Sequence, residues 1–150
     1  MAALKPIVFR LGNELYGVDI SKVIGIEKDQ TVVRVPNSST CIKGIINLRG
    51  SIIPVYSLRE KFKMPPCPNE IKLIVVKCND MMIALEVDEV QEINDLVEEN
   101  IKGFPRIALN PDTRFFRNVA NVGGKLILII DVDDLLTREE EENAKQLIEE

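Results

Sequence analysis

The sequence predicts an all-β fold built from two small, related β-barrels, and three observations support this class. About ten short apolar segments alternate with turn residues, and few segments have helical periodicity. Residues 44–58 match residues 118–132 at an offset of 74, and residues 17–26 match residues 84–93 at an offset of 67. The two pairs occur in the same order in each half, which indicates an internal duplication. Short strands need their edges closed, and barrels close them.

Most of the expected strands in both halves pair as hairpins. The predicted strands are residues 7–11, 15–20, 31–36, 44–48, 51–56, 71–77 and 81–87. The connection Arg49-Gly50 is short enough to form a tight turn between two of them. Pro54 has no N–H group for a ladder, so its strand is expected to lie at a sheet edge or to be bulged there.

Helical signals are fewer and short. In residues 21–27, Val23 and Ile26 are three positions apart, which favours one or two buried helical turns. Ser57 followed by Glu60 is a capping-box pattern that begins a short helix. The same spacing recurs at Asp131 and Asp134 and, before a C-terminal helix, at Thr137 and Glu140. That last helix has a narrow apolar stripe made of Ala144, Leu147 and Ile148.

The domain organisation follows from the repeat and from a proline-rich joint. Residues 63–70 contain three prolines and separate the two copies. We therefore expect one domain over residues 1–150, with halves at about 5–66 and 70–137 that can exchange strands, and an acidic C-terminal helix over 138–150.

Composition excludes several function classes. The chain has 150 residues, a net charge of −5 and no histidine, which removes the commonest general base and metal ligand. No dense basic run exists, so nucleic-acid binding is not expected. The apolar runs are too short to span a bilayer, and the first residues do not resemble a signal peptide, so a cytoplasmic location is expected. Three widely spaced cysteines are expected to be buried or incidental free thiols: Cys41, Cys67 and Cys78.

Catalytic and cofactor-binding motifs are not found. The carboxylates occur in two groups, Asp131, Asp133 and Asp134 and then Glu86 and Asp88. The first group is explained by helix capping, and strand alternation places the second on an exposed face. No serine has a basic partner in sequence, and no glycine-rich phosphate loop precedes a helix. We therefore expect no enzymatic activity, no cofactor and no metal.

Arg49 is the residue that the duplication singles out. The second copy has Gly123 at this position, so the fold does not require an arginine there. A side chain at the tip of a hairpin projects into solvent, where it is either a solvated turn residue or an interface anchor. Arginine is enriched among residues that dominate binding energy.

The sequence resembles the CheW family of bacterial chemotaxis coupling proteins over about residues 5–137. The most specific likeness lies in residues 42–62, IKGIINLRGSIIPVYSLREKF. The positions that match the family pattern are Gly44, Asn47, Leu48, Arg49, Gly50, Pro54, Leu58 and Arg59. Residues 16–26 and 120–136 resemble two further family segments. Ser57 replaces an aspartate, which preserves helix capping, and Gly25 replaces an acidic residue on the segment that faces receptors.

The resemblance implies two SH3-like five-stranded β-barrel subdomains and a non-enzymatic scaffold. It implies binding to the CheW-like regulatory domain of the histidine kinase CheA and to the cytoplasmic tips of chemoreceptors, in membrane-associated receptor arrays. By analogy the receptor-binding residues are Val23, Ile24, Gly44 and Arg49. The kinase would contact exposed apolar strand edges, which cannot be assigned to residues. Two alternatives remain: a CheW-like adaptor of another kinase-based sensory system, and a β-barrel that binds a small ligand or hydrolyses a substrate.

Overall fold

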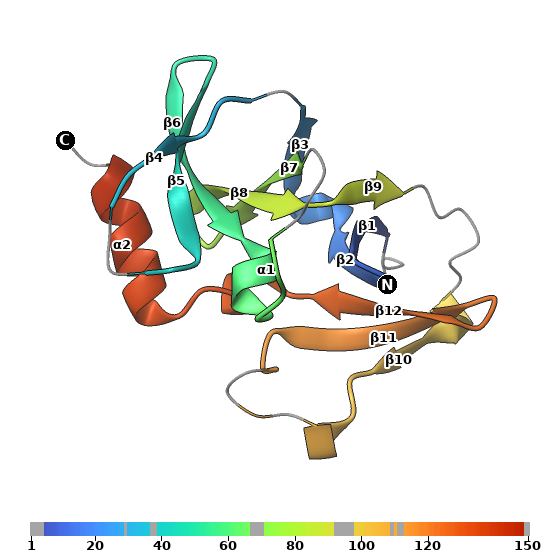
Figure 1. The fold of residues 1–150 in the computed structure, drawn as a ribbon. Coiled ribbons are helices and arrows are strands. Elements are labelled where there is room, and N and C mark those ends of the chain that lie inside the picture. The colour runs from blue at the N-terminus through green and yellow to red at the C-terminus, as the bar shows by residue number, and fades with distance from the viewer. Residues whose placement is uncertain are drawn as a thin grey trace.

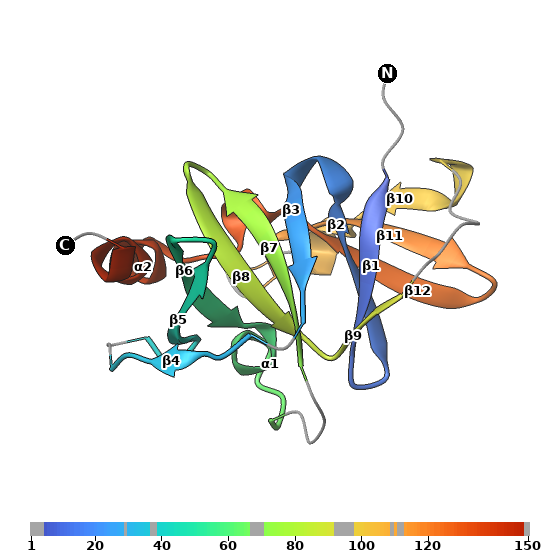
Figure 2. The ribbon, with the colours of Figure 1, turned by 90° about the horizontal axis from the view of Figure 1, so that it is seen from above.

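Two six-stranded sheets form the framework of the computed structural model (Figures 1 and 2). The structure describes residues 5–28, 30–36, 39–66, 71–91, 98–108, 110 and 113–148. Sheet A contains β1 (Pro6–Leu11), β2 (Glu14–Asp19), β9 (Glu89–Gln91), β10 (Ile101–Gly103), β11 (Phe116–Val122) and β12 (Lys125–Ile130). Sheet B contains β3 (Val23–Glu27), β4 (Val33–Arg34), β5 (Ile42–Leu48), β6 (Ser51–Ser57), β7 (Lys72–Cys78) and β8 (Met81–Val87).

The helices are short except at the C-terminus. They are the 3-10 turns η1 (Ile20–Lys22), η2 (Glu98–Asn100), η3 (Arg106–Ala108) and η4 (Val132–Asp134) and the α-helices α1 (Leu58–Lys61) and α2 (Arg138–Ile148). The predicted all-β class with short helices and a C-terminal helix is therefore confirmed, as a mostly-β fold. Each sheet has six strands where five-stranded units are expected, because short edge strands of two or three residues extend each sheet.

Each sheet draws strands from both halves of the sequence. The order in sheet A is β10-β11-β12-β2-β1-β9, and in sheet B it is β4-β5-β6-β8-β7-β3. The hairpin β1–β2 thus lies beside strands of the second half, and β7–β8 lies beside strands of the first half (Figure 2). The two joins, β12 to β2 and β6 to β8, are both parallel. The two orders correspond strand for strand, which fits a duplicated unit with exchanged hairpins; the division into halves stays a prediction.

The main core lies between the two sheets. It includes fully buried side chains from both, such as Phe9 and Val18 of sheet A and Tyr56 and Leu85 of sheet B. Burial of these apolar side chains is the main favourable contribution to the free energy of folding. Ala144 of α2 joins the same cluster, so the C-terminal helix is part of the core and not an appendage.

The three predicted helix starts are observed. The Ser57 hydroxyl accepts a hydrogen bond from the Glu60 N–H at 3.2 Å, and the Asp131 carboxylate accepts one from Asp133. Thr137 and Glu140 form the complete capping box, because each side chain accepts a hydrogen bond from the other residue's N–H, at 3.1 and 2.9 Å.

Two local predictions were wrong. Residues 23–27 form strand β3 and not a helix, because Ile24 and Ile26 share an outward face with a period of two and the β-branched residues suit an extended backbone. Pro54 lies in β6, which is internal and not at an edge. Pro54 pairs with Ile45 of β5, but the ladder between β6 and β8 begins only at Val55, so no donor is needed on the β8 side of Pro54. The register shift in this hairpin lies opposite Val55 and Tyr56 and not at Pro54.

Candidate protein-binding site

The β5–β6 turn explains which repeated residues serve the fold. Its two turn residues both have left-handed backbones, with φ 51° at Arg49 and 89° at Gly50. The side chain of Asn47 accepts a hydrogen bond from the Gly50 N–H at 2.9 Å. The β11–β12 turn repeats this geometry, because Asn121 accepts from Gly124 at 3.1 Å and the turn glycines have φ 57° and 85°. The shared asparagine and second glycine therefore build the turn.

Arg49 occupies a conformation that disfavours any side chain with a Cβ atom. A left-handed backbone costs a non-glycine residue about 1 kcal/mol. The equivalent residue is Gly123, which avoids this cost. Arg49 is exposed and belongs to the turn between β5 and β6. The end of this hairpin projects from the molecule (Figure 1). A strained, exposed arginine that the fold does not need is a sign of a function outside the fold.

An exposed apolar surface lies on and beside β3, one of the two edge strands of sheet B. Ile20 of η1 is 51% exposed, and Ile24 and Ile26 of β3 are 52% and 40% exposed. We call these three residues the β3 surface. Val23 points the other way and packs against the main core. The register between β3 and β7 shifts between Val23 and Gly25, so a bulge presents Ile24.

Gly44 has a structural reason to be glycine. It is buried in β5 and pairs with Arg34 of the neighbouring strand β4. A Cβ atom at this position would lie 2.0 Å from the Val33 carbonyl oxygen and 2.9 Å from Arg34 Cα. Gly44 therefore lets β4 lie close against β5.

The structure places all four sequence-predicted site residues in sheet B. Val23 and Ile24 lie on β3 at one end of the strand order, whereas Gly44 and Arg49 belong to β5 and its turn near the other end. Ile24 and Arg49 are exposed; Val23 and Gly44 are not. Sequence reasoning missed Ile20 and Ile26. The alternation of Ile24 and Ile26 was the signal that could have identified a strand with an apolar outer face.

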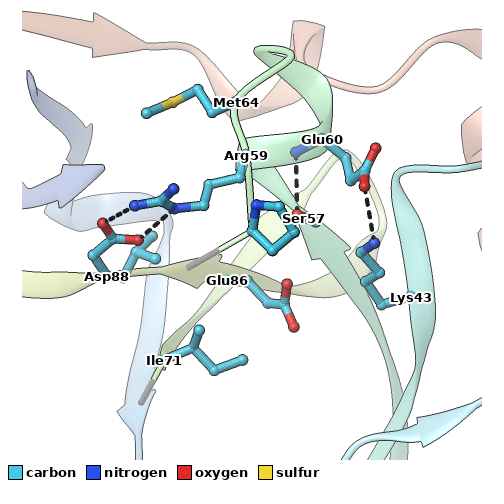
Figure 3. A pocket seen from close by; sticks show the side chains of 10 residues that line it. Lys43, Ser57, Arg59, Glu60, Met64, Ile71, Glu86 and Asp88 are labelled. Carbon is cyan, nitrogen blue, oxygen red and sulfur yellow. Dashed lines mark hydrogen bonds and ion pairs between the residues drawn. The ribbon is translucent and has the colours of Figure 1, made fainter. Parts of the chain in front are cut away.

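The carboxylate pair at the end of β8 forms part of a structural cluster. Figure 3 shows Asp88 in a bidentate ion pair with Arg59, with Nε to Oδ1 at 2.8 Å. Asp88 also accepts a hydrogen bond from the Gly12 N–H at 2.7 Å. The prediction that Asp88 is exposed was wrong, since the side chain is 7% exposed. The chain crosses from sheet B to sheet A here, so alternation along β8 does not apply beyond Val87.

The pocket around this pair does not have the arrangement of an active site. Its volume is about 170 Å³. Lys43 pairs with Glu60 at 3.2 Å, as Arg59 pairs with Asp88 (Figure 3). Burial raises the pKa of Glu86, and the charge of Lys43 and a hydrogen bond from Ser57 partly offset that effect. Lys43 and Arg59 are thus held in ion pairs, and the Ser57 hydroxyl, which bonds Glu86, also caps α1, so these side chains serve the fold.

The aspartates after β12 are also structural. Asp131 caps η4, and Arg117 pairs with both Asp131 and Asp134. Asp133 accepts a hydrogen bond from the Asn79 N–H at 2.8 Å and pairs with Lys22 at 2.9 Å. Within the described ranges, no three histidine, cysteine or acidic side chains lie close enough to hold a metal ion.

The described cysteines are buried thiols, as expected. Cys41 and Cys78 are free and buried. Burial raises the pKa of Cys41 to about 11 and that of Cys78 to about 12, so neither forms a reactive thiolate at neutral pH. Cys67 lies outside the described residues.

These features define a class of protein: a two-sheet β module with exposed apolar side chains on an edge strand, with no catalytic arrangement in the part of the chain described. Comparison with known proteins identifies the family. A model of the CheW-like domain matches residues 5–140. The chain therefore belongs to the CheW-like domain family and is a non-enzymatic CheW chemotaxis scaffold protein.

Relatives and a solved structure agree with this assignment. The chain is 33% identical over 136 residues to the Chemotaxis protein CheW of Klebsiella aerogenes, covering 89% of this chain and 82% of the relative. It is 29% identical over 142 residues to the Bacillus subtilis Chemotaxis protein CheW, covering 93% and 91%. The crystal structure of the scaffolding protein TtCheW from Thermoanaerobacter tengcongensis superposes with a TM-score of 0.82 at 34% identity, covering 93% of this chain and 97% of that one. Among the described residues, no helix is long and apolar enough to cross a membrane.

Proposed function

We propose that this chain couples the histidine kinase CheA to the cytoplasmic tips of chemoreceptors, in receptor arrays on the cytoplasmic side of the membrane. The observation that carries the proposal is Arg49, an exposed arginine held in a left-handed turn where the duplicated turn has Gly123. Arginine presents five donors in a planar fork, which suits a partner that offers carboxylates or carbonyl oxygens.

The receptor side of the proposal combines Arg49 with the β3 surface. The three exposed isoleucines provide apolar contact area. Exposing this area to water does not stabilise the folded chain, whereas burying it against a partner is favourable. Arg49 and the β3 surface lie toward opposite ends of the strand order of sheet B, so a receptor tip that uses both must contact two separate parts of the sheet. Arginine and buried apolar side chains are both typical of protein–protein interfaces. A receptor tip is the partner that the family relationship supports.

The kinase side would use the strand edges of the sheets. β4 and β10 each pair with a neighbour on one side, and Val33 of β4 is 56% exposed. Unpaired backbone groups beside an apolar side chain suit association with another β domain. The CheW-like regulatory domain of CheA is the partner proposed for this edge, without assignment to single residues.

A three-component binding experiment tests this function. The purified chain is mixed with the CheW-like domain of CheA, with a receptor cytoplasmic fragment, and with both. The chain should bind each partner separately and join them in one complex, without ATP or Mg²⁺. No complex with the kinase domain at tens of micromolar, or mutually exclusive binding of the two partners, would contradict a coupling role. Matches over most of the chain to relatives named for chemotaxis favour this role over service to another sensory system.

A further inference from the structure

The two copies of the repeat each contain an ion-pair clamp at an equivalent place. Each clamp joins the turn of one copy's first hairpin and the short helix after the same copy's sixth strand to the junction that leads into the other copy's third strand. In one clamp the carboxylate of Asp88 accepts the Gly12 N–H and pairs with Arg59. In the other the carboxylate of Asp133 accepts the Asn79 N–H and pairs with Lys22.

The clamps are equivalent in position and opposite in polarity. Gly12 and Asn79 differ by the repeat offset of 67, and Arg59 and Asp133 differ by the offset of 74; Lys22 and Asp88 differ by 66, one residue less than the offset of 67. The helix supplies the cation in the first clamp and the anion in the second. The turn N–H binds a carboxylate in both. The same kinds of element are joined in both clamps although the charged groups are exchanged between them. The clamp therefore fixes the point where the chain passes from one sheet to the other.

The two clamps differ in burial and in the strand that they hold. Arg59 and Asp88 are 13% and 7% exposed and lie where β8 leads into β9. Lys22 and Asp133 are 42% and 33% exposed and lie where η1 leads into β3. The solvated clamp therefore anchors the strand that bears the exposed isoleucines, and Lys22 lies in sequence between Ile20 and Ile24.

We propose that the Lys22–Asp133 pair is a positioning element of the receptor-binding surface, which holds β3 in its binding geometry. This inference rests on the proposed function, since it assigns the β3 surface to the receptor. Neither residue needs to touch the receptor. Their effect is pre-organisation: without the pair, the edge strand must be ordered when the receptor binds, and that cost weakens the complex.

Two readouts test the proposal together: amide hydrogen exchange at residues 23–27 and affinity for a purified receptor tip fragment. Lys22→Met and Asp133→Ala should each speed exchange in β3 and weaken receptor binding about five-fold, the size expected for loss of a solvated charge pair. Lys22→Arg keeps the charge and should retain both properties.

The equivalent clamp supplies the matched control. Asp88→Ala removes the buried carboxylate and should lower global stability, while exchange at residues 23–27 and receptor affinity stay at wild-type values at a temperature where the variant is folded. Unchanged β3 exchange in Lys22→Met would overturn the proposal, as would faster exchange with full affinity. Affinity that follows global stability in both clamps would overturn it too.

Failure of the proposed function gives a different result. If Ile24→Ala and Arg49→Ala both bind the receptor fragment normally, the receptor does not use this surface. The exchange rates in Lys22→Met are measured without receptor, so they report on the clamp independently of that outcome.

Discussion

The hydroxyl of Tyr56 donates a hydrogen bond to the Glu140 carboxylate at 2.9 Å, which joins β6 to α2 in a buried site. The same oxygen accepts the Thr137 N–H at 2.9 Å and lies 3.3 Å from Lys61 Nζ. One carboxylate therefore caps the helix and fixes it to sheet B.

Replacing Glu140 should loosen the attachment of α2. Glu140→Gln removes the charge and leaves an amide that cannot serve all three donors, so the free energy of unfolding should fall by about 1–2 kcal/mol. Urea unfolding measures this. Glu142→Gln, at an exposed position of the same helix, should change stability by less than about 0.5 kcal/mol. Equal effects of the two substitutions would contradict the role given to Glu140.

Two carboxylates should give opposite contributions to the pH dependence of stability. Burial raises the pKa of Glu140, but the Thr137 N–H, the Lys61 charge and the Tyr56 hydroxyl outweigh it, so the pKa lies below its usual 4.5. Its stabilising contribution is present above pH 4.5 and is lost as the pH falls through the folded-state pKa.

Burial raises the pKa of Glu86 above the same value. The folded state then binds the proton more tightly than the unfolded state, so stability is lost as the pH rises through the folded-state pKa. Glu86→Gln should raise the urea midpoint at pH 7 and leave it unchanged near pH 3, whereas Glu140→Gln should lower the midpoint at pH 7. Midpoints that move in the same direction at pH 7 would show that one of the two environments is assigned incorrectly.

The close approach of β4 to β5 predicts intolerance of a side chain at Gly44. Its added Cβ would meet backbone atoms of Val33, which cannot rotate away. Gly44→Ala should lower the free energy of unfolding by about 1–3 kcal/mol. Gly103→Ala is the control, because nothing lies within 4 Å of a Cβ at that edge-strand position. If both variants unfold at the same urea concentration, β4 is not held as described.

Local chemistry made much of this fold predictable. Ser57 and Thr137 mark helix starts because a side-chain oxygen at a fixed spacing satisfies a free backbone N–H. Asn47 and Gly50 mark their turn because the repeat supplied a second example, in which Gly123 replaces Arg49. Comparison of the copies thus separated the turn's structural residues from the candidate functional one.

Long-range placement was not predictable in the same way. Alternation predicted an exposed Asp88, but its environment is set by Arg59 and Gly12, which are distant in sequence and adjacent only through the sheet crossover. The strand identity of residues 23–27 depended on pairing with β7. The alternation of Ile24 and Ile26 indicated an apolar face only once the segment was known to be a strand, and Ile20 lies outside that strand, in η1, so the full β3 surface could not be derived from spacing alone.

Arg49→Gly tests the central claim most directly, because it converts the β5–β6 turn into the sequence of its own duplicate. The glycine relieves the left-handed strain, so the free energy of unfolding should stay the same or rise by up to about 1 kcal/mol. Affinity for a receptor tip fragment should fall by roughly 2 kcal/mol or more, as for a hot-spot arginine. Arg49→Lys should also bind weakly, since lysine keeps the charge and loses the planar donor fork.

The measurement is therefore receptor affinity and unfolding free energy on the same Arg49→Gly sample. A more stable or equally stable protein with weakened receptor binding is the predicted result. Full receptor binding by Arg49→Gly would contradict the account, and so would a large loss of stability, since Arg49 would then serve the fold and not the partner.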